Sequence, residues 1–351
     1  MSINIEDLLR DNIKKIIPYS TARDEYKGSN VTVFLDANEN PFDTSLNRYP
    51  DPHQQKLKEK IAEIQGIPTA KIFLGNGSDE VIDLITRAFC RPGIDKIMIH
   101  PPTYGMYQVA AQTNDNEVIK VNLTSEFQLN VNEILSHANE NLKVFFICSP
   151  NNPTGNTFAV KDIERILTGL NTIVVIDEAY INFSDKASWI NRLAEFPNLI
   201  VMQTLSKAWG LAGIRLGMGF ASERIVEVLS RIKLPYNLNI LTQQTALTTL
   251  NNIETYKQNL AILKNERQIL ITELSKIEAV EKVYPSDGNY LLCKFKDADK
   301  TYNYLMNKGI IVRNRSNQLH CENCLRITVG TPEENIVLIR YLSRMKLEIG
   351  N

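Results

Sequence analysis

The chain has 351 residues, of which 39 are Lys or Arg and 40 are Asp or Glu, so its formal net charge is -1. Hydrophobic residues make up 43% and charged residues 23% of the sequence, which is the balance of an ordinary soluble globular protein. A nearly neutral chain is not built to hold nucleic acid by bulk charge or to lie on an anionic membrane. Its length allows one large domain and a smaller one.

The N-terminal segment and the cysteines indicate where the protein works. Residues 1–20 mix acidic side chains with short apolar runs and lack the uninterrupted apolar core of a signal peptide. No run of about eighteen apolar residues occurs, so the sequence predicts no membrane span. The cysteines are odd in number, which favours reduced thiols. We therefore expect a cytoplasmic protein.

The segment HCENC places His320, Cys321 and Cys324 close together in the sequence. A zinc site would need a second pair of ligands at suitable spacing, and the sequence offers none. We therefore interpret the segment as a loop that enters the strand LRITVG, and we predict no metal. The sequence leaves the role of the two cysteines open.

The first part of the chain predicts helices separated by a turn. Apolar residues recur near helical spacing in 1–18, which predicts an amphipathic helix, and DANENPF (36–42) has the composition of a turn. QQKLKEKIAEIQGI (54–67) predicts a helix that stops near Gly66.

The middle of the chain alternates short apolar runs with helical segments. Continuous apolar runs are typical of parallel strands that are buried on both faces of a sheet. Strands are expected at 71–75, 96–100, 143–150, 172–180, 198–206 and 215–222. Their alternation with helices predicts an α/β domain with right-handed crossovers.

After residue 240 the pattern changes. One long helical region (242–277) precedes strands that look antiparallel, at 289–295, 309–314 and 325–330. We therefore expect three parts: an N-terminal arm that packs on the small domain, a large domain that binds the cofactor, and a small α+β domain. Their expected bounds are 1–42, 43–240 and 241–351.

Polar side chains follow several of the predicted strands, and ligands of open α/β sheets bind at the carboxyl ends of strands. GNGSDE (75–80) lies between a strand and a helix, so its glycines, amides and Ser78 could cradle a phosphate. The alternative is a simple helix N-cap made by Ser78 or Asp79. SPNNPTG (149–155) either fixes two asparagine amides on a rigid turn or is a plain turn.

Two charged residues point to a cofactor. Asp177 in IDEAY ends an apolar run, and burial of its carboxylate is costly without a cationic partner. A Walker-B role would need G-x-x-x-x-G-K-[ST], which the chain lacks. Lys207 in TLSKAWGLAGIR lies among small residues, where an amine can become nucleophilic. With a phosphate cup that includes Arg215 and a stacking ring from Tyr104, these residues supply what pyridoxal phosphate requires.

At this point the sequence resembles the fold-type I, class II aminotransferases that use pyridoxal phosphate. The resemblance covers nearly the whole chain and is closest to the branch that acts on histidinol phosphate in histidine biosynthesis. It implies a mostly parallel seven-stranded sheet flanked by helices, a smaller α+β domain and a homodimer with shared active sites. The motifs that carry it are LDANENPF, RYPDP, GNGSDE, SPNNPTG, IDEAY, TLSKAWGLAGIR, GIIVRNRSNQ and CLRITVGT.

The resemblance also implies a role for each cofactor residue. Lys207 would attach the cofactor and move the proton, and Asp177 would pair with the ring nitrogen. Asn152 and Tyr180 would hydrogen-bond the phenolic oxygen of the ring, and Tyr104 would stack on its face. The phosphate cup would be formed by Gly77, Ser78, Asp79, Ser206 and Arg215, together with Tyr49 from the partner subunit.

The substrate residues follow from the same resemblance. Arg326 would bind the substrate carboxylate or phosphate, because a guanidinium offers paired donors in a plane. Tyr19, Asn38 and Arg313 would complete the pocket. The reaction would be a ping-pong exchange of an amino group between glutamate and 2-oxoglutarate, and between histidinol phosphate and imidazole acetol phosphate.

Other functions remain open on the same residues. The fold also carries aromatic amino-acid aminotransferases and a phosphothreonine decarboxylase, because a fold does not settle the substrate. GIIVRNRSNQ favours a phosphorylated substrate through Arg313. A ligand sensor fused to a DNA-binding segment would need a basic helix-turn-helix, for which the N-terminal arm is too short.

Overall fold

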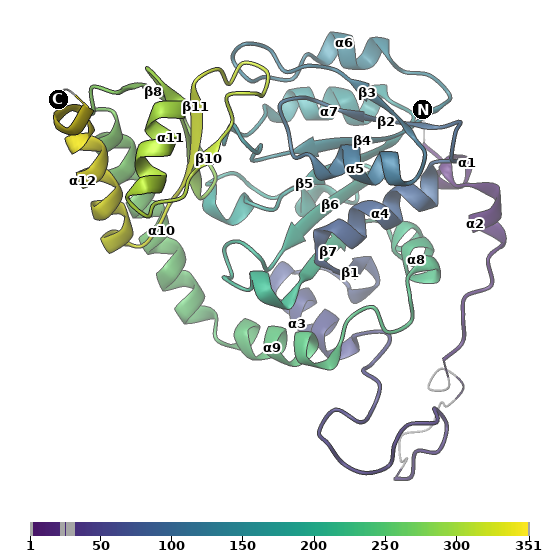
Figure 1. Ribbon diagram of the computed structural model, residues 1–351. Coiled ribbons are helices and arrows are strands. Elements are labelled where there is room, and N and C mark those ends of the chain that lie inside the picture. Colours follow the sequence, from purple (N-terminus) through teal and green to yellow (C-terminus); the bar gives the residue numbers. More distant parts are fainter. Residues whose placement is uncertain (1–2, 22–24, 26–31, 350–351) are drawn as a thin grey trace.

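The computed structural model describes residues 3–21, 25 and 32–349, and it contains two β-sheets surrounded by helices (Figure 1). The larger sheet has seven strands in the order β1-β7-β6-β5-β4-β2-β3. Their bounds are β1 (Ile72–Asn76), β2 (Lys96–Ile99), β3 (Glu117–Lys120), β4 (Leu142–Cys148), β5 (Ile173–Asp177), β6 (Leu199–Thr204) and β7 (Leu216–Phe220).

The central strands of this sheet are parallel, because helical crossovers connect them. Only β7 runs against its two neighbours, β1 and β6. The predicted fold class, a mostly parallel sheet of seven strands flanked by helices, is therefore confirmed. The short strand β3 at the sheet edge was missed in the sequence, because its burial is only partial.

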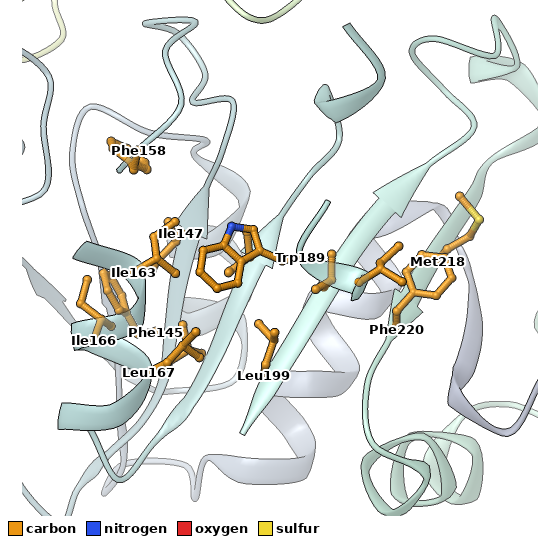
Figure 2. Packing of buried hydrophobic residues seen from close by; sticks show 14 of the residues in the cluster. Phe145, Ile147, Phe158, Ile163, Ile166, Leu167, Trp189, Leu199, Met218 and Phe220 are labelled. Atoms are coloured by element: carbon orange, nitrogen blue, oxygen red, sulfur yellow. The ribbon is translucent and has the colours of Figure 1, made fainter. Parts of the chain in front are cut away.

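Helices cover both faces of the large sheet. The helices of this part of the chain are α3 (Gln55–Gln65), α4 (Gly77–Phe89), α5 (Met106–Thr113), α6 (Val131–Ser136), α7 (Val160–Gly169) and α8 (Glu223–Ile232). Successive residues of β4 alternate between the two cores: Phe145 and Ile147 belong to one, Val144 and Phe146 to the other. Figure 2 shows the first core, where side chains of α7 pack against β4.

The smaller sheet has four strands in the order β10-β11-β9-β8, and all of its pairs are antiparallel. Its strands are β8 (Val280–Val283), β9 (Tyr290–Phe295), β10 (Arg313–Asn314) and β11 (Cys324–Thr328). It packs with α10 (Ile253–Leu274), α11 (Ala298–Asn307) and α12 (Pro332–Ile349) around a core of its own. The linking helix α9 (Ile240–Asn251) comes directly before α10.

Several predicted elements are shorter than expected. The helix expected at 1–18 is broken into α1 (Ile5–Leu8) and α2 (Asp11–Lys15), because the Arg10 N–H donates to the Ala88 carbonyl oxygen at 3.2 Å. The long helix expected at 242–277 is interrupted at Asn252, whose φ of -104° and ψ of 54° are not helical. Of the strand expected at 309–314, only β10 forms.

The N-terminal arm does not pack where we expected. Ile5, Leu8, Leu9 and Ile13 are buried in the core that α4 and α8 form on the large sheet, rather than against the small sheet. The apolar side of these two short helices finds its partner there, and Glu6 pairs with an arginine of α8. Residues 32–54 have no helix or strand and form a loop that projects from this end of the molecule (Figure 1).

The N-terminus of α4 lies against β7 with no room for a side chain between them. A Cβ atom on Gly217 would lie 2.3 Å from the Gly77 carbonyl carbon and 2.3 Å from the Ser78 nitrogen. Both contacts are with backbone, so neither neighbour can rotate away. The glycine in β7 therefore sets how closely the first turn of α4 approaches the sheet.

We expect Gly217→Ala to destabilise the protein by about 1–3 kcal/mol, because overpacking forces the backbone apart. Denaturant unfolding measures this loss. Gly213→Ala is the matched control, because a Cβ at Gly213 meets nothing within 4 Å. Equal midpoints for the two variants would contradict the close approach.

Candidate active site

The candidate site lies where parallel strands of the large sheet end. Asp177 is the last residue of β5, Asn152 follows β4, and Lys207 follows β6. Because the carboxyl ends of neighbouring parallel strands meet at one edge of the sheet, loops far apart in sequence converge there. The burial of every residue of β5 and β6 anchors these loops to the core.

Asp177 is a buried carboxylate that has hydrogen bonds but no ion pair. It is 3% exposed, and it accepts a hydrogen bond from the Tyr107 hydroxyl at 2.6 Å and from the Ala179 N–H at 3.0 Å. In the part of the chain that the structure describes, no cation forms a salt bridge with it. Burial raises the pKa of Asp177, and the bond from Tyr107 opposes that rise.

Tyr107 is a site residue that the sequence analysis missed. It is fully buried on α5, where its ring stacks on Phe146 with centroids 4.8 Å apart. A buried tyrosine needs a partner for its hydroxyl, and here the partner is Asp177. The sequence signal was Tyr104 with Tyr107 three residues later, on a helix that follows a strand. Only the first of the two was singled out.

Glu178, the neighbour of Asp177, has a different set of hydrogen-bond partners. Its carboxylate accepts from the Ser188 hydroxyl, from the Trp189 N–H at 2.7 Å and from the Gln203 amide at 3.0 Å. Burial raises the pKa of Glu178 from 4.5 to about 7, in spite of these donors. The donors around Glu178 are not candidate site residues. Of the two adjacent acids, Asp177 is therefore the one that belongs to the candidate site.

The first turn of α4 lies beside Arg215, where the sequence predicts a phosphate cup. Gly77 and Arg215 both have positive φ, of 75° and 55°, and the Gly77 N–H donates to the Arg215 carbonyl oxygen at 2.8 Å. This bond uses the Gly77 amide, which leaves those of Ser78 and Asp79 for a phosphate. The N-cap residue is Asn76 and it makes no side-chain capping bond, so capping by Ser78 or Asp79, the alternative interpretation, does not occur.

Two side chains meet at Asp79 in the cup. The Arg215 guanidinium lies 3.2 Å from one carboxylate oxygen of Asp79, and the Tyr104 hydroxyl donates to the other at 3.2 Å. Arg215 is about half exposed, so it can turn towards an anion. Ser206 is also tied locally, since its hydroxyl accepts a hydrogen bond of 2.9 Å from Thr204.

Lys207 lies between these groups. Its amine is 5.6 Å from the centre of the Tyr180 ring. Partial burial and the nearby Arg326 lower the pKa of Lys207, while Asp177 acts in the opposite direction. The side chain stays open to solvent, so water moderates the effect. The result is an accessible amine that loses its proton more readily than an ordinary lysine.

A chain of polar contacts joins the large sheet to the small one. Arg326 of β11 donates to the Asn152 side-chain oxygen at 2.5 Å, and the Asn152 amide donates to the Tyr180 hydroxyl at 3.5 Å. Tyr180 also meets Tyr290 of β9 edge to face, with centroids 5.0 Å apart. SPNNPTG is thus more than a plain turn, because Asn152 connects the two sheets.

Three predicted site residues lie apart from this group in the single chain. Tyr19 lines a cavity of about 260 Å³ beside α3 and α8, and it is 74% exposed. Asn38 is exposed on the loop. Tyr49 stacks on Tyr236 with centroids 4.5 Å apart. Their roles stay predictions, and so does that of Arg313, which is exposed on β10 opposite Arg326.

The cysteine segment forms a turn whose cysteines are buried, while Glu322 and Asn323 between them are exposed. Cys321 and Cys324 are fully buried as free thiols, and β11 begins at Cys324. Among the described residues, no group of three or more His, Cys, Asp or Glu side chains is arranged to hold a metal ion. Within the same part of the chain, no helix has the length and apolar character needed to span a membrane.

Comparisons with known proteins agree with this geometry. Residues 23–342 match the family described as aminotransferase class I and II. The chain is 53% identical over 344 residues to a histidinol-phosphate aminotransferase of Parabacteroides distasonis, covering 98% of this chain and 99% of that one. It is 52% identical over 346 residues to one of Christiangramia forsetii, covering 98% and 99% of the two chains.

A solved structure has a similar fold. The histidinol-phosphate aminotransferase of Sinorhizobium meliloti, in complex with pyridoxal-5'-phosphate, has a TM-score of 0.78 at 22% identity. The match covers 87% of this chain and 84% of that one. The present chain therefore belongs to the class I and II aminotransferase family, and it is an aminotransferase, as its sequence motifs predicted.

We expect the raised pKa of Glu178 to appear in the pH dependence of stability. Between pH 4.5 and about 7 the folded chain binds more protons at this residue than the unfolded chain, so stability falls as pH rises. Glu178→Gln does not titrate and lacks this fall. Denaturant unfolding of both proteins at several pH values measures the difference, and parallel curves would show that Glu178 titrates normally.

Proposed function

We propose that this chain is a histidinol-phosphate aminotransferase that exchanges an amino group between glutamate and imidazole acetol phosphate. The observation that carries the proposal is the position of Asp177 and Lys207 at the ends of β5 and β6, with Arg326 of the small sheet hydrogen-bonded to Asn152, which follows β4. Relatives with that name, about half identical over nearly their whole length, support the substrate.

The residues present fit pyridoxal phosphate. Asp177 is a fully buried carboxylate without an ion-pair partner among the described residues, which is the environment that a protonated ring nitrogen would complete. At the other end, the free amides of the α4 N-terminus and the Arg215 guanidinium suit a phosphate group. Asn152 and Tyr180 would hold the phenolic oxygen between these ends.

The chemistry divides between cofactor and chain. Pyridoxal phosphate, when bound, supplies a pyridinium ring that withdraws the electron pair left on the substrate Cα after its proton is removed. Lys207 would hold the cofactor and, as a free amine, would remove and return that proton. Its lowered pKa favours the uncharged form that can accept a proton. Burial raises the pKa of Asp177, and a protonated ring nitrogen beside it would favour the ionised carboxylate, whose electrostatic effect is strong in a water-poor site.

Substrate recognition rests on anionic groups. Arg326 bridges Asn152 and the ring of Tyr290, whose centre lies 5.3 Å from the guanidinium. It is thus held in one orientation, from which it can bind a glutamate carboxylate in one half of the reaction and a phosphate ester in the other. Tyr19 and Asn38 would complete the pocket from the arm.

We further propose a cytoplasmic homodimer in which the arm covers the partner subunit. The described part of the arm exposes a series of large apolar side chains, which is unusual for a monomer. They include Ile17, Tyr19, Val33, Leu35 and Phe42, and the adjoining Leu46 and Tyr49 are exposed as well. In the dimer, Tyr49 would reach the partner's cofactor phosphate, and residues 43–240 and 241–351 would form the large and the small domain.

The proposed function predicts the behaviour of two variants. Lys207→Ala should lower multiple turnover with glutamate and imidazole acetol phosphate by about a thousandfold or more, because both attachment and proton transfer are lost. Asp177→Asn should retain part of the cofactor binding and lose about a hundredfold in rate. Phenylpyruvate is the rival acceptor. Faster turnover with phenylpyruvate in the wild-type enzyme would overturn the proposed substrate.

The shared site predicts complementation between two inactive chains. Tyr49→Ala retains Lys207, and Lys207→Ala retains Tyr49, so a mixed dimer contains one intact site. Co-refolded mixtures should regain about a quarter of the wild-type activity, as random pairing requires. Steady-state rates after mixing measure this recovery. Mixtures no more active than the separate variants would argue against a site shared across the dimer.

A further inference from the structure

The hairpin of β10 and β11 brings arginines together on one face. Arg313 lies directly opposite Arg326 in the antiparallel register. Like charges in this position repel each other. The Arg315 N–H donates to the Cys324 carbonyl oxygen at 2.9 Å, which extends the ladder by one step. Because side chains alternate along a strand, Arg315 lies on the same face as Arg313. Figure 1 shows β10 at the edge of the small sheet nearest the large one.

Arg315 is enclosed among these charges. Its Nε atom is buried and has no hydrogen-bond partner. Burial is the main cause that lowers the pKa of Arg315 to about 10, and Arg326 and Arg313 lower it further. Arg326, one of these neighbours, hydrogen-bonds Asn152 of the candidate site. An arginine in this setting is costly to keep charged unless an anion joins it.

Within the residues that the structure describes, none of the three arginines forms a salt bridge with Asp or Glu. The only hydrogen bond that their guanidinium groups make there is the one from Arg326 to Asn152. Three positive charges without a counter-ion, beside the proposed cofactor site, indicate that a multiply charged anion completes them.

We propose that Arg315 is a specificity-determining residue that, with Arg313 and Arg326, binds the phosphate of the phosphorylated substrate. This inference rests on the proposed function and adds a residue that the motif comparison left without a role. A phosphate monoester carries close to two charges and three acceptor oxygens. A carboxylate has one charge and two oxygens, and a single guanidinium can satisfy it in bidentate fashion. Arg315 therefore strengthens the binding of the phosphorylated substrate more than the binding of glutamate.

The test compares Arg315→Gln and Arg315→Lys with Arg340→Gln in the holoenzyme. Arg340 is exposed on α12, so its variant removes the same charge from the same part of the chain. We expect Arg315→Gln to lower kcat/KM for histidinol phosphate about tenfold or more, mainly through KM, because charge-assisted bonds to phosphate are lost. The kcat/KM for glutamate should change less than about threefold in the same variant. Arg315→Lys should recover part of the loss, and Arg340→Gln should resemble the wild type.

A binding measurement separates recognition from folding. Inorganic phosphate should raise the Tm of the wild-type holoenzyme, in which the cofactor already fills the cup on α4, and should raise that of Arg315→Gln much less. Without added anions the variant should melt no lower than the wild type, because a repelled charge has been removed. A lower melting temperature with an unchanged response to phosphate would mean that Arg315 is only structural, and would overturn the proposal.

The failure of the proposed function is a distinct outcome. If the wild-type enzyme does not use histidinol phosphate, the proposed function is wrong, and the response to inorganic phosphate then decides the role of Arg315. Equal losses for glutamate and histidinol phosphate in Arg315→Gln would also overturn the inference, because they would show general anion attraction rather than selection of a phosphate.

Discussion

The structure depends on one buried carboxylate at the end of a central strand. Asp177 is placed by β5, which is buried along its whole length, and is held by the hydroxyl of Tyr107. Such a charge is costly inside a protein, and hydrogen bonds offset only part of the cost. The sheet, α5 and the loop after β6 all contribute to its surroundings. A cationic group, such as the pyridinium nitrogen of the proposed cofactor, would offset the rest of that cost.

The opposite end of the site depends on close packing rather than on charge. Gly217 lets the first turn of α4 approach β7, and Gly77 takes a positive φ beside Arg215. This arrangement places the first turn of α4 beside Arg215. In the proposed function, Asp177 and this turn would hold the two ends of the cofactor, and both are attached to the large sheet.

In the proposed function, the small sheet would supply the side chains that distinguish one substrate from another. Arg326 crosses to Asn152, and the hairpin that carries it also carries Arg313 and Arg315. Its position relative to Tyr180 and Tyr290 is therefore part of the site. The proposed cofactor residues belong to the large sheet, and Arg313, Arg315 and Arg326 belong to the small one. Reaction chemistry and substrate selection would therefore depend on different parts of the fold, which Asn152 connects.

Much of this protein is determined by local sequence. The apolar runs predicted the central strands, and the residues at their ends predicted Lys207, Asp177 and the α4 cup, because period and position act over a few residues. Tertiary structure alone decided the rest. Tyr107 can be recognised as a partner of Asp177 only once α5 lies beside β5. The arm packs on α4 because that surface accepts its apolar side. Arg315 comes next to the other two arginines only when β10 pairs with β11. These are contacts between segments distant in the chain, so no local pattern encodes them.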